Sequence, residues 1–397
     1  MHESSTETQA DSECTRATVV ESTGQAVSAR VFGLSSRERL QRSFASSGLQ
    51  SIESAELEHL TGERLIALST SHFYDGRLIA ALAKRKDDVL LLADDSEATL
   101  AAVGMVGDAS QVERLIPALQ TGIYREESAE AAGVRIVRPT DLVPAYDSKL
   151  RKHAPAFVVP ASTDRAREAE GLIFDASYKG ITDFVTKWVW PVPARIVTRW
   201  CSRLGIVPNT VTALSYLTAL VTLLAFGEGE FGIGLLSAWL MTFLDTVDGK
   251  LARVTLNTSK LGDALDHGLD IVHPPLWWVA WAAGLAGPGE IFGVFAPWAW
   301  VVFVGYIVGR LLEGFFILFF GQEMFTWRPF DIKFRLVIAR RNPNLVLLSA
   351  AMLLGRPDLG LIAVGIWTLC CILVQCVRIF QAAAFQMRGR EIRPFAP

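Results

Sequence analysis

The stretch FLDTVDGKLARVTLNTSKLGDALDHGLD, residues 243–270, concentrates regularly spaced carboxylates in an otherwise apolar second half of the chain. Asp245 and Asp248 are three residues apart, and Asp266 and Asp270 are four apart. Residues at these spacings lie on one face of a helix, so two helices could direct four carboxylates into one pocket. Hard divalent cations such as Mg²⁺ or Mn²⁺ prefer oxygen ligands, and phosphate oxygens can fill the remaining positions. The spacing therefore predicts a metal-assisted phosphoryl site.

The residues between the carboxylates suit the same chemistry. Gly249, Ala252 and Gly262 are small, which would let a nucleotide approach the backbone. Arg253 can donate two hydrogen bonds to a phosphate. The eight residues spell D-x2-D-G-x2-A-R-x8-G-x3-D-x3-D, a pattern far more specific than a lone glycine-rich loop. It resembles, position for position, the signature of the CDP-alcohol phosphotransferase (CDP-alcohol phosphatidyltransferase) family of membrane enzymes.

That resemblance implies a reaction. The four aspartates would hold two divalent ions, Mg²⁺ or Mn²⁺, that bind the diphosphate of a CDP-linked lipid or alcohol donor. A hydroxyl acceptor would attack the phosphorus distal to cytidine, and CMP would leave. The acceptor's proton would go to Asp270 or to His267, whose DHGLD context resembles the choline and ethanolamine phosphotransferases. A structural donor role for His267 is the simpler alternative. Gly249, Ala252, Arg253 and Gly262 would line the substrate pocket.

Three further polar residues are candidates for binding substrate. Asn209 and Thr212, after Pro208, resemble a family motif at the cytidine end, although a helix cap explains Asn209 equally well. Arg310 lies three residues before Glu313 inside an apolar segment, where a charge is costly. The pair could neutralise itself, or Arg310 could bind a phosphate or the acceptor.

Composition and length point to two unlike halves. A chain of 397 residues predicts two domains, and 51% hydrophobic residues, including 11 Trp and 22 Phe, weight the second half towards a membrane. A net charge of −3 gives no case for nucleic-acid binding, and the five cysteines form no CxxC pair. We expect a disordered leader at 1–27, an α/β domain at 28–160, an interfacial amphipathic segment at 161–205, and a membrane domain at 206–397.

The α/β domain is expected from short apolar runs that alternate with amphipathic segments. It resembles the sugar-nucleotidyltransferase fold that is fused ahead of the same membrane domain in relatives that make CDP-inositol. The run VFGL at 31–34 lacks the glycine-rich phosphate cradle, so we expect a non-catalytic domain, with Asp94 and Asp95 as residual candidates. The expected strands are Leu65–Ser69, Val89–Ala93 and Val134–Val137, and the expected helices are Ser36–Ser47, Gly76–Lys84 and Ala109–Leu119.

The membrane domain is expected to contain six transmembrane helices of about 20 residues each. Lysines and arginines concentrate in the connections on one side, which places both termini and the active site in the cytoplasm by the positive-inside tendency, in a bacterial inner membrane. Gly305 and Gly309 form a GxxxG pair that predicts close helix packing or a homodimer seam. The expected spans are Asn209–Phe226, Gly232–Val247, His267–Leu285, Phe292–Phe320, Leu345–Leu354 and Leu359–Phe380.

The segment ahead of the first span interleaves basic residues with tryptophans, a composition that favours the headgroup zone of a membrane. A basic linker helix that merely packs on the domain is the alternative. Within this segment, Tyr178-Lys179-Gly180 and Asp183 resemble a lead-in found in the fused inositol-lipid relatives.

Other functions remain open from the residues alone. An ion-coupled transporter could also hold carboxylates in a bundle, but neither an inverted repeat nor matching interrupted spans are visible. A scaffold that has lost activity would not be expected to retain the complete motif. The donor could be CDP-diacylglycerol or a CDP-linked polar alcohol, and the acceptor an inositol phosphate, a glycerol phosphate, another polyol or a lipid hydroxyl.

Overall fold

The computed structural model describes residues 15–23, 29–53, 64–92, 102–121, 135–147, 150–257 and 260–395. Its chain forms two compact units. The first contains residues up to 145 and returns at 154–175, and the second contains 146–153 and 176–397. A short hairpin of the second unit therefore interrupts the first unit in sequence.

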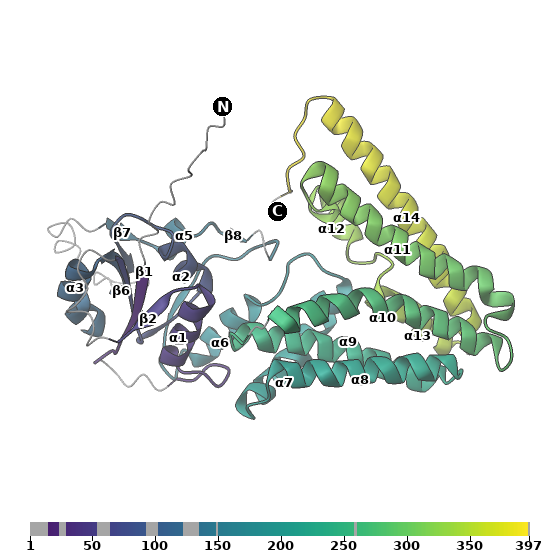
Figure 1. Ribbon diagram of the computed structural model, residues 1–397, viewed down its shortest axis with the longest axis horizontal. Helices are drawn as coiled ribbons and strands as arrows, with labels where there is room; N and C mark the ends of the chain where they lie inside the picture. Colours follow the sequence, from purple (N-terminus) through teal and green to yellow (C-terminus); the bar gives the residue numbers. More distant parts are fainter. Residues whose placement is uncertain are drawn as a thin grey trace, which may run out of the picture. The chain divides into compact units, whose positions relative to one another are not determined.

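The first unit is built on a six-stranded mixed sheet in the order β2-β1-β3-β6-β5-β7 (Figure 1). Strand β1 pairs in parallel with β2 and β3, and β6 runs antiparallel to both of its neighbours. The strands are β1 (Thr15–Val20), β2 (Gln50–Ile52), β3 (Arg64–Ser69), β5 (Val89–Leu92), β6 (Ala102–Asp108) and β7 (Arg135–Val137). A separate pair joins β4 (His72–Tyr74) to β10 (Val158–Pro160).

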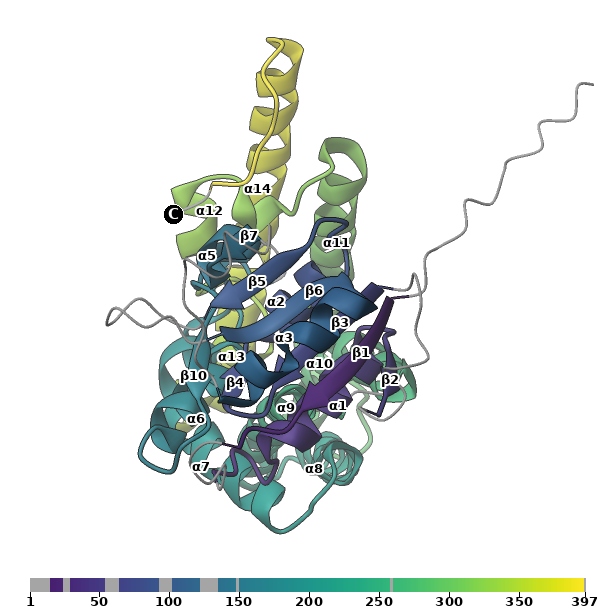
Figure 2. The same cartoon turned by 90° about the vertical axis from the view of Figure 1, so that its left-hand side faces the viewer.

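Alternation along β3 explains why both faces of this sheet are covered. Ile66 and Leu68 pack in one core with helices α1 (Ser36–Ser46) and α2 (Gly76–Leu82). Leu65 belongs to a second core with helix α3 (Ala109–Thr121). Because successive side chains of a strand point to opposite faces, a run of apolar residues here indicates a sheet between two helical layers. Figure 2 looks onto the sheet with α3 in front of it.

The expected elements of this unit are confirmed within a few residues at their ends. Helix α1 begins as predicted because Ser35 and Glu38 form a capping box, and the carboxylate of Asp75 caps α2. The leader at 1–27 needs correction, because residues 15–20 form β1 between two strands of the sheet. The polar residues Thr15, Arg16 and Thr18 in this strand concealed its β character. Asp94 and Asp95 lie outside the described residues.

The second unit is helical. Its long helices are α8 (Pro208–Gly227), α9 (Phe231–Val254), α10 (Lys260–Ala286), α11 (Ala296–Phe320), α13 (Arg341–Leu353) and α14 (Pro357–Met387). Within the described residues, four segments are long and apolar enough to cross a membrane: Pro208–Gly227, Phe231–Val254, Gly293–Phe320 and Pro357–Met387. The chain is therefore an integral membrane protein with four candidate spans.

The other two expected spans coincide with helices of a different kind. Helix α13 has 13 residues, which cover about 20 Å, whereas a bilayer core is about 30 Å thick. Helix α10 has 27 residues, but several of its side chains lie outside the described set. The prediction of six spans is therefore supported for four of them.

Tight packing joins the membrane helices. Trp277, Trp278 and Trp281 of α10 are buried in a core shared by α8, α9, α11, α13 and α14. A Cβ on Gly305 of α11 would lie 2.5 Å from Cγ2 of Thr368 on α14, so the two helices approach too closely for a side chain at this point. One Gly of the GxxxG pair thus serves packing within the chain, as one of the two predicted uses requires.

The segment ahead of the first span divides between the units. Helix α6 (Ala166–Asp175) belongs to the first unit, and η2 (Val185–Val189) with α7 (Pro191–Arg203) belongs to the second. Helix α7 packs against α9 through Ala194, Thr198 and Cys201. Its opposite face exposes the apolar side chains Val192, Ile196 and Trp200 at a spacing of four residues, and Trp188 of η2 is exposed as well. This amphipathic pattern is typical of a helix at a membrane surface.

Candidate functional site

The first carboxylate pair lies on one face of α9 and is held by residues far away in sequence. Asp248 is buried and its Oδ2 accepts a hydrogen bond of 2.8 Å from Oγ1 of Thr212 on α8. The Oδ2 atom of Asp245 accepts one of 2.5 Å from Nη2 of Arg341, at the start of α13. In this structure the guanidinium of Arg341 supplies the positive charge beside Asp245. Thr212 thus lies against the carboxylate site, whereas Asn209, in the first turn of α8, is exposed.

The second carboxylate pair lies on α10. Asp266, Asp270 and His267 occupy one uninterrupted helix, as the spacing predicts, and Gly262 lies in its first turn. The side chains of Asp266, Asp270 and His267 lie outside the described residues, so their roles stay predictions. Among the side chains that are described, no three potential metal ligands cluster.

Two cations that follow Asp248 converge on one carbonyl group. The Nζ atom of Lys250 donates a hydrogen bond of 2.9 Å to the carbonyl oxygen of Ser177, and Nη1 of Arg253 donates one of 3.1 Å to the same oxygen. The ammonium of Lys250 also lies 3.5 Å from the ring centroid of Tyr178, a cation–π contact. Ser177, directly before the lead-in Tyr178-Lys179-Gly180, thus orients Arg253 of the sequence motif together with Lys250.

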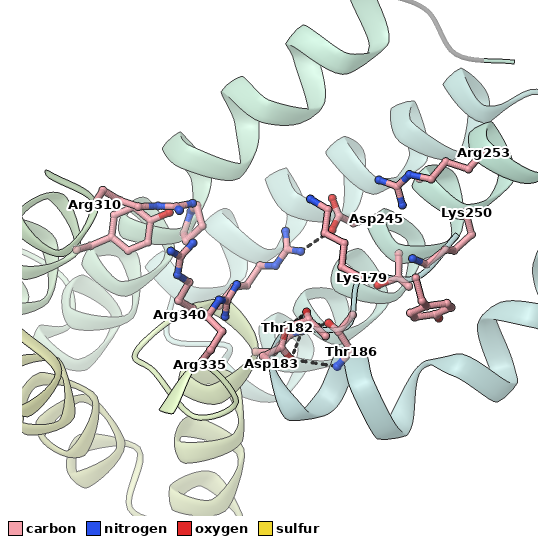
Figure 3. Close-up of a pocket in the computed structure, with 17 residues that line it drawn as sticks. Lys179, Thr182, Asp183, Thr186, Asp245, Lys250, Arg253, Arg310, Arg335 and Arg340 are labelled. Carbon is pink, nitrogen blue, oxygen red and sulfur yellow. Dashed lines mark hydrogen bonds and ion pairs between the residues drawn. The ribbon is translucent and has the colours of Figure 1, made fainter. Parts of the chain in front are cut away.

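A cavity of about 570 Å³ opens beside these residues. Its lining includes Gly249, whose missing side chain leaves open space: a Cβ there would meet its nearest neighbour, Nη1 of Arg253, only at 3.9 Å. Cations dominate the charged part of the wall. Lys250 and Arg253 lie towards one end, Arg310, Arg335 and Arg340 lie towards the other, and Lys179 lies between them (Figure 3). Arg341, the first residue of α13, also lines the cavity. The described acidic lining residues are Asp183 and Asp245.

Arg335 contributes a guanidinium that is poorly compensated. Burial, followed by the nearby charge of Arg340, lowers the pKa of Arg335 to about 9, while Glu313 and Asp183 act in the opposite direction. Its Nη1 atom is buried and has no hydrogen-bond partner among the described residues. Arg335 remains cationic at neutral pH, so the wall presents a positive charge that an anion would balance.

Glu313 organises the neighbouring arginines. Its Oε2 pairs closely with Nη2 of Arg340 and lies 3.7 Å from Nη1 of Arg310. Its Oε1 accepts a hydrogen bond of 3.3 Å from Nε2 of Gln375 on α14. Since Arg340 is the closer partner, Glu313 does not bind Arg310 alone. Arg310 lines the cavity, where the sequence left its role open.

Asp183 lines the cavity near Arg335 and is held by several hydrogen bonds. Its Oδ1 accepts hydrogen bonds from the backbone N–H groups of Val185 and Thr186 and from Nδ2 of Asn342. Its Oδ2 accepts one from the Thr186 hydroxyl. These contacts cap η2 and connect it to the start of α13. Asp183 is thus a local structural anchor next to the cavity.

Several cavity residues were not predicted as site residues. Arg335, Arg340 and Arg341 were expected only as basic loop residues, and Lys179 only as part of a lead-in. The available signal was their density, since three arginines lie within the seven residues 335–341. Nothing local to the sequence indicated that they would meet α9.

Comparison with known proteins agrees with the arrangement in the second unit. Residues 205–327 match the sequence model of a family described as CDP-alcohol phosphatidyltransferase. A phosphatidylinositol phosphate synthase from Streptomyces avermitilis is 34% identical over 116 residues, which cover 29% of this chain and 40% of that protein. The chain thus aligns with about two fifths of the length of this relative, so the match is partial.

Proposed function

The C-terminal half of this chain belongs to the CDP-alcohol phosphatidyltransferase family of enzymes, and we propose that the protein transfers a phosphatidyl-type group from a CDP-linked lipid to a hydroxyl acceptor with release of CMP. The observation that carries this proposal is the cationic cavity beside Asp245 on α9. Phosphoryl transfer depends chiefly on positioning and on stabilising negative charge, which such a cavity can supply. The reaction would serve phospholipid biosynthesis.

The donor occupies the end of the cavity near α8 and α9. Arg253 and Lys250 line this end of the cavity and would contact the diphosphate. The missing side chain of Gly249 leaves room for the nucleotide. Ala252 and Gly262 are assigned to the same pocket from the family pattern. Thr212 helps to hold Asp248, and Asn209 remains a candidate at the cytidine end.

The carboxylates fit a hard divalent cation. Asp245 and Asp248 share one face of α9, and Asp245 already lies next to a positive charge, that of Arg341. Asp266 and Asp270 would complete the set from α10, and Mg²⁺ or Mn²⁺, two ions in the full site, would offset the charge of the diphosphate and of the departing CMP. In the presence of metal, Arg341 would be released from Asp245 to contact the substrate.

The acceptor carries a phosphate. Arg310 and Arg335 lie at the end of the cavity away from Arg253, and the guanidinium of Arg335 has no described ion-pair partner (Figure 3). Arginine forks bind phosphate well, so a phosphorylated polyol of the inositol phosphate type suits this wall better than an unphosphorylated alcohol. The name of the Streptomyces avermitilis relative agrees with this choice.

The chemical step forms one phosphorus–oxygen bond and breaks another. The acceptor hydroxyl attacks the donor phosphorus distal to cytidine, the bond to the bridging oxygen breaks, and that oxygen leaves with CMP. Asp270 takes the hydroxyl proton, with His267 as the second candidate. The cations of the cavity hold both phosphates in place during the transfer.

The remaining parts of the chain have supporting roles in this proposal. Six helices, α8, α9, α10, α11, α13 and α14, form the membrane domain, with both termini and the site on the cytoplasmic side of a bacterial inner membrane. The interfacial segment lies on that surface through α7. The first unit is a non-catalytic nucleotidyltransferase-like domain. A homodimer is inferred from the family resemblance alone, since Gly305 packs within the chain.

An assay of CMP release tests the function. Full-length protein in lipid nanodiscs, supplied with CDP-diacylglycerol, inositol phosphate and Mg²⁺, should release CMP and form a phosphatidyl polyol phosphate that mass spectrometry identifies. Asp245→Asn should abolish both signals while the folded protein remains extractable, because the side chain keeps its size but loses its charge. EDTA should stop turnover, and Mg²⁺ or Mn²⁺ should restore it. Full activity in Asp245→Asn, or ion transport without CMP, would contradict the proposal.

A further inference from the structure

A β-hairpin between the two halves of the first unit belongs to the second unit. Strands β8 (Tyr146–Asp147) and β9 (Lys152–His153) pair antiparallel, and the N–H of Ala154 donates a hydrogen bond of 2.7 Å to the carbonyl oxygen of Ala145 at the base. The chain leaves the first unit at 145, contributes this hairpin, and returns at 154. The contacts that this hairpin makes within the second unit explain its position.

The tip of the hairpin lies directly on Gly180. The N–H of Gly180 donates a hydrogen bond of 2.6 Å to the carbonyl oxygen of Leu150. A Cβ on Gly180 would lie 2.4 Å from the carbonyl oxygen of Arg151 and 2.7 Å from Cβ of Lys152. Real Cβ atoms do not approach other atoms this closely, so only glycine fits the contact.

The side chain of Arg151 fixes the hairpin at a second point. Its Nη2 forms an ion pair with Oε1 of Glu323, in the connection that follows α11. The backbone of Arg151 has φ of 54°, a left-handed conformation that is unfavourable for a residue with a side chain. The hydrogen bond accepted by Leu150, together with the close approach and the ion pair of Arg151, indicates a specific docking geometry.

Lys179 is the residue beside this docking point. Its side chain extends to the cavity, where it lies near Asp245 (Figure 3). In the described part of the chain it makes no hydrogen bond or ion pair, and Arg151, Arg253 and Arg335 all add like charge around it, against Glu323. Lys179 is exposed, and the backbone of residues 177–180 sets the part of the cavity that its ammonium can reach.

We propose that Lys179 is a phosphate-binding residue of the cavity and that the hairpin Tyr146–His153 is the element that positions it. This inference rests on the proposed function for the identity of the substrates. It concerns two features that the sequence motif does not contain: an ammonium contributed by the lead-in and a hairpin contributed from within the first unit. The phosphate could belong to the donor or to the acceptor, because Lys179 lies between the two ends of the cavity.

Steady-state kinetics of full-length Lys179→Ala and Lys179→Arg in nanodiscs test the binding role. Loss of a charge-assisted hydrogen bond should raise one KM about 10- to 100-fold with kcat changed less, and Lys179→Arg should recover most of the loss. A raised KM for CDP-diacylglycerol would assign the donor phosphate, and a raised KM for inositol phosphate the acceptor phosphate. Wild-type values of both constants in Lys179→Ala would overturn the proposal.

Binding of inorganic pyrophosphate, measured by calorimetry, separates this inference from the proposed function. Weaker binding by Lys179→Ala than by the wild type would support the inference even if the wild type released no CMP. Equal binding by the two proteins, together with normal CMP release, would reject the inference and leave the proposed function intact.

The hairpin is tested through Gly180 and the ion pair. Gly180→Ala should raise the same KM as Lys179→Ala, and the double variant should be no worse than Lys179→Ala, because both changes act through one contact. Gly232→Ala is the matched control, since a Cβ there meets nothing within 4 Å. Arg151→Glu and Glu323→Arg should each raise that KM, and their combination should restore it. Additive effects of Gly180→Ala and Lys179→Ala would show that the hairpin does not act through Lys179.

Discussion

Arg335 brings a guanidinium to the cavity wall at a position where burial lowers its pKa to about 9 and Nη1 lacks a described hydrogen-bond partner. Residues of this kind are costly to a fold that does not use them. Arg340 and Arg341 differ from Arg335, because each is paired with a carboxylate, Glu313 and Asp245 respectively. Of these three arginines, Arg335 is therefore the one whose charge is left for an anion to balance.

Arg335→Gln should raise the KM for a phosphorylated acceptor about 10- to 100-fold, since a charged hydrogen bond contributes about 1.5–3 kcal/mol. The KM for the CDP-linked donor should change little. Initial rates of CMP release at varied acceptor concentration measure the effect. Arg356→Gln is the control, because Arg356 forms an exposed ion pair with Asp358 remote in sequence from the cavity residues. An unchanged acceptor KM in Arg335→Gln would exclude an acceptor phosphate at this wall.

The pH dependence of substrate binding provides a second prediction for single residues. Burial, then Arg151, then Arg253, lower the pKa of Lys179 below its usual value, with Glu323 opposing and Arg335 adding to the shift. Lys179 is cationic below this lowered pKa and loses its charge as the pH rises through it. We therefore expect kcat/KM to fall on the alkaline side earlier than an ordinary lysine would allow. In Lys179→Arg the fall should move to higher pH, because guanidinium keeps its proton.

Helices α11 and α14 approach each other at Gly305, and α11 also carries Tyr306 and Arg310 of the cavity lining. Arg310 and Glu313 lie on α11 beyond Gly305, and Gln375 of α14 hydrogen-bonds to Glu313. A change in the separation of these helices would move the carboxylate that orients Arg340. Gly305 therefore contributes to the geometry of the cavity as well as to helix packing.

Gly305→Ala should lower the apparent melting temperature of the detergent-solubilised protein, because the new methyl group would lie 2.5 Å from Cγ2 of Thr368. Overpacking of this kind costs about 1–3 kcal/mol. Gly314→Ala, on the same helix with open space around the new Cβ, should be neutral or slightly stabilising. Size-exclusion detection after heating measures both variants. Equal melting temperatures would show that α11 and α14 can separate at Gly305 without cost.

The whole molecule combines a membrane unit, for which we propose phosphotransfer, with a first unit for which we propose no chemistry of its own. Glu21 follows directly after β1, where a nucleotidyltransferase would place its phosphate loop, and its carboxylate is bound to Arg37 and Thr70. A carboxylate there repels a triphosphate. The hairpin that lies on Gly180 is inserted in the first unit between Ala145 and Ala154.

The full-length protein should accordingly release no pyrophosphate from CTP and sugar or polyol phosphate, even with Mg²⁺ present. A coupled pyrophosphate assay measures this, with CMP release from CDP-diacylglycerol confirming that the same preparation is active. Pyrophosphate formation from CTP would show that the first unit is a working nucleotidyltransferase.

Local patterns determined much of this protein in advance. The spacing of the aspartates predicted one helical face for each pair, and apolar length predicted the four spans that the structure supports. Capping residues such as Ser35 and Asp75 set helix starts correctly, since these signals act within a few residues. The strand at 15–20 was missed because its neighbours in the sheet, rather than its own residues, give it its place.

Only the tertiary structure brought Arg335, Arg341 and Lys179 to one cavity with Asp245. Arg335 and Arg341 follow Asp245 by 90 and 96 residues, and Lys179 precedes it by 66, so their meeting depends on how α9, α13 and the lead-in pack. The role of Gly180 was likewise invisible, because a glycine signals a close approach only when the approaching atoms, here those of Arg151, are known. Sequence spacing reports what one element presents, whereas the charge balance of a cavity is the sum over elements that meet only after folding.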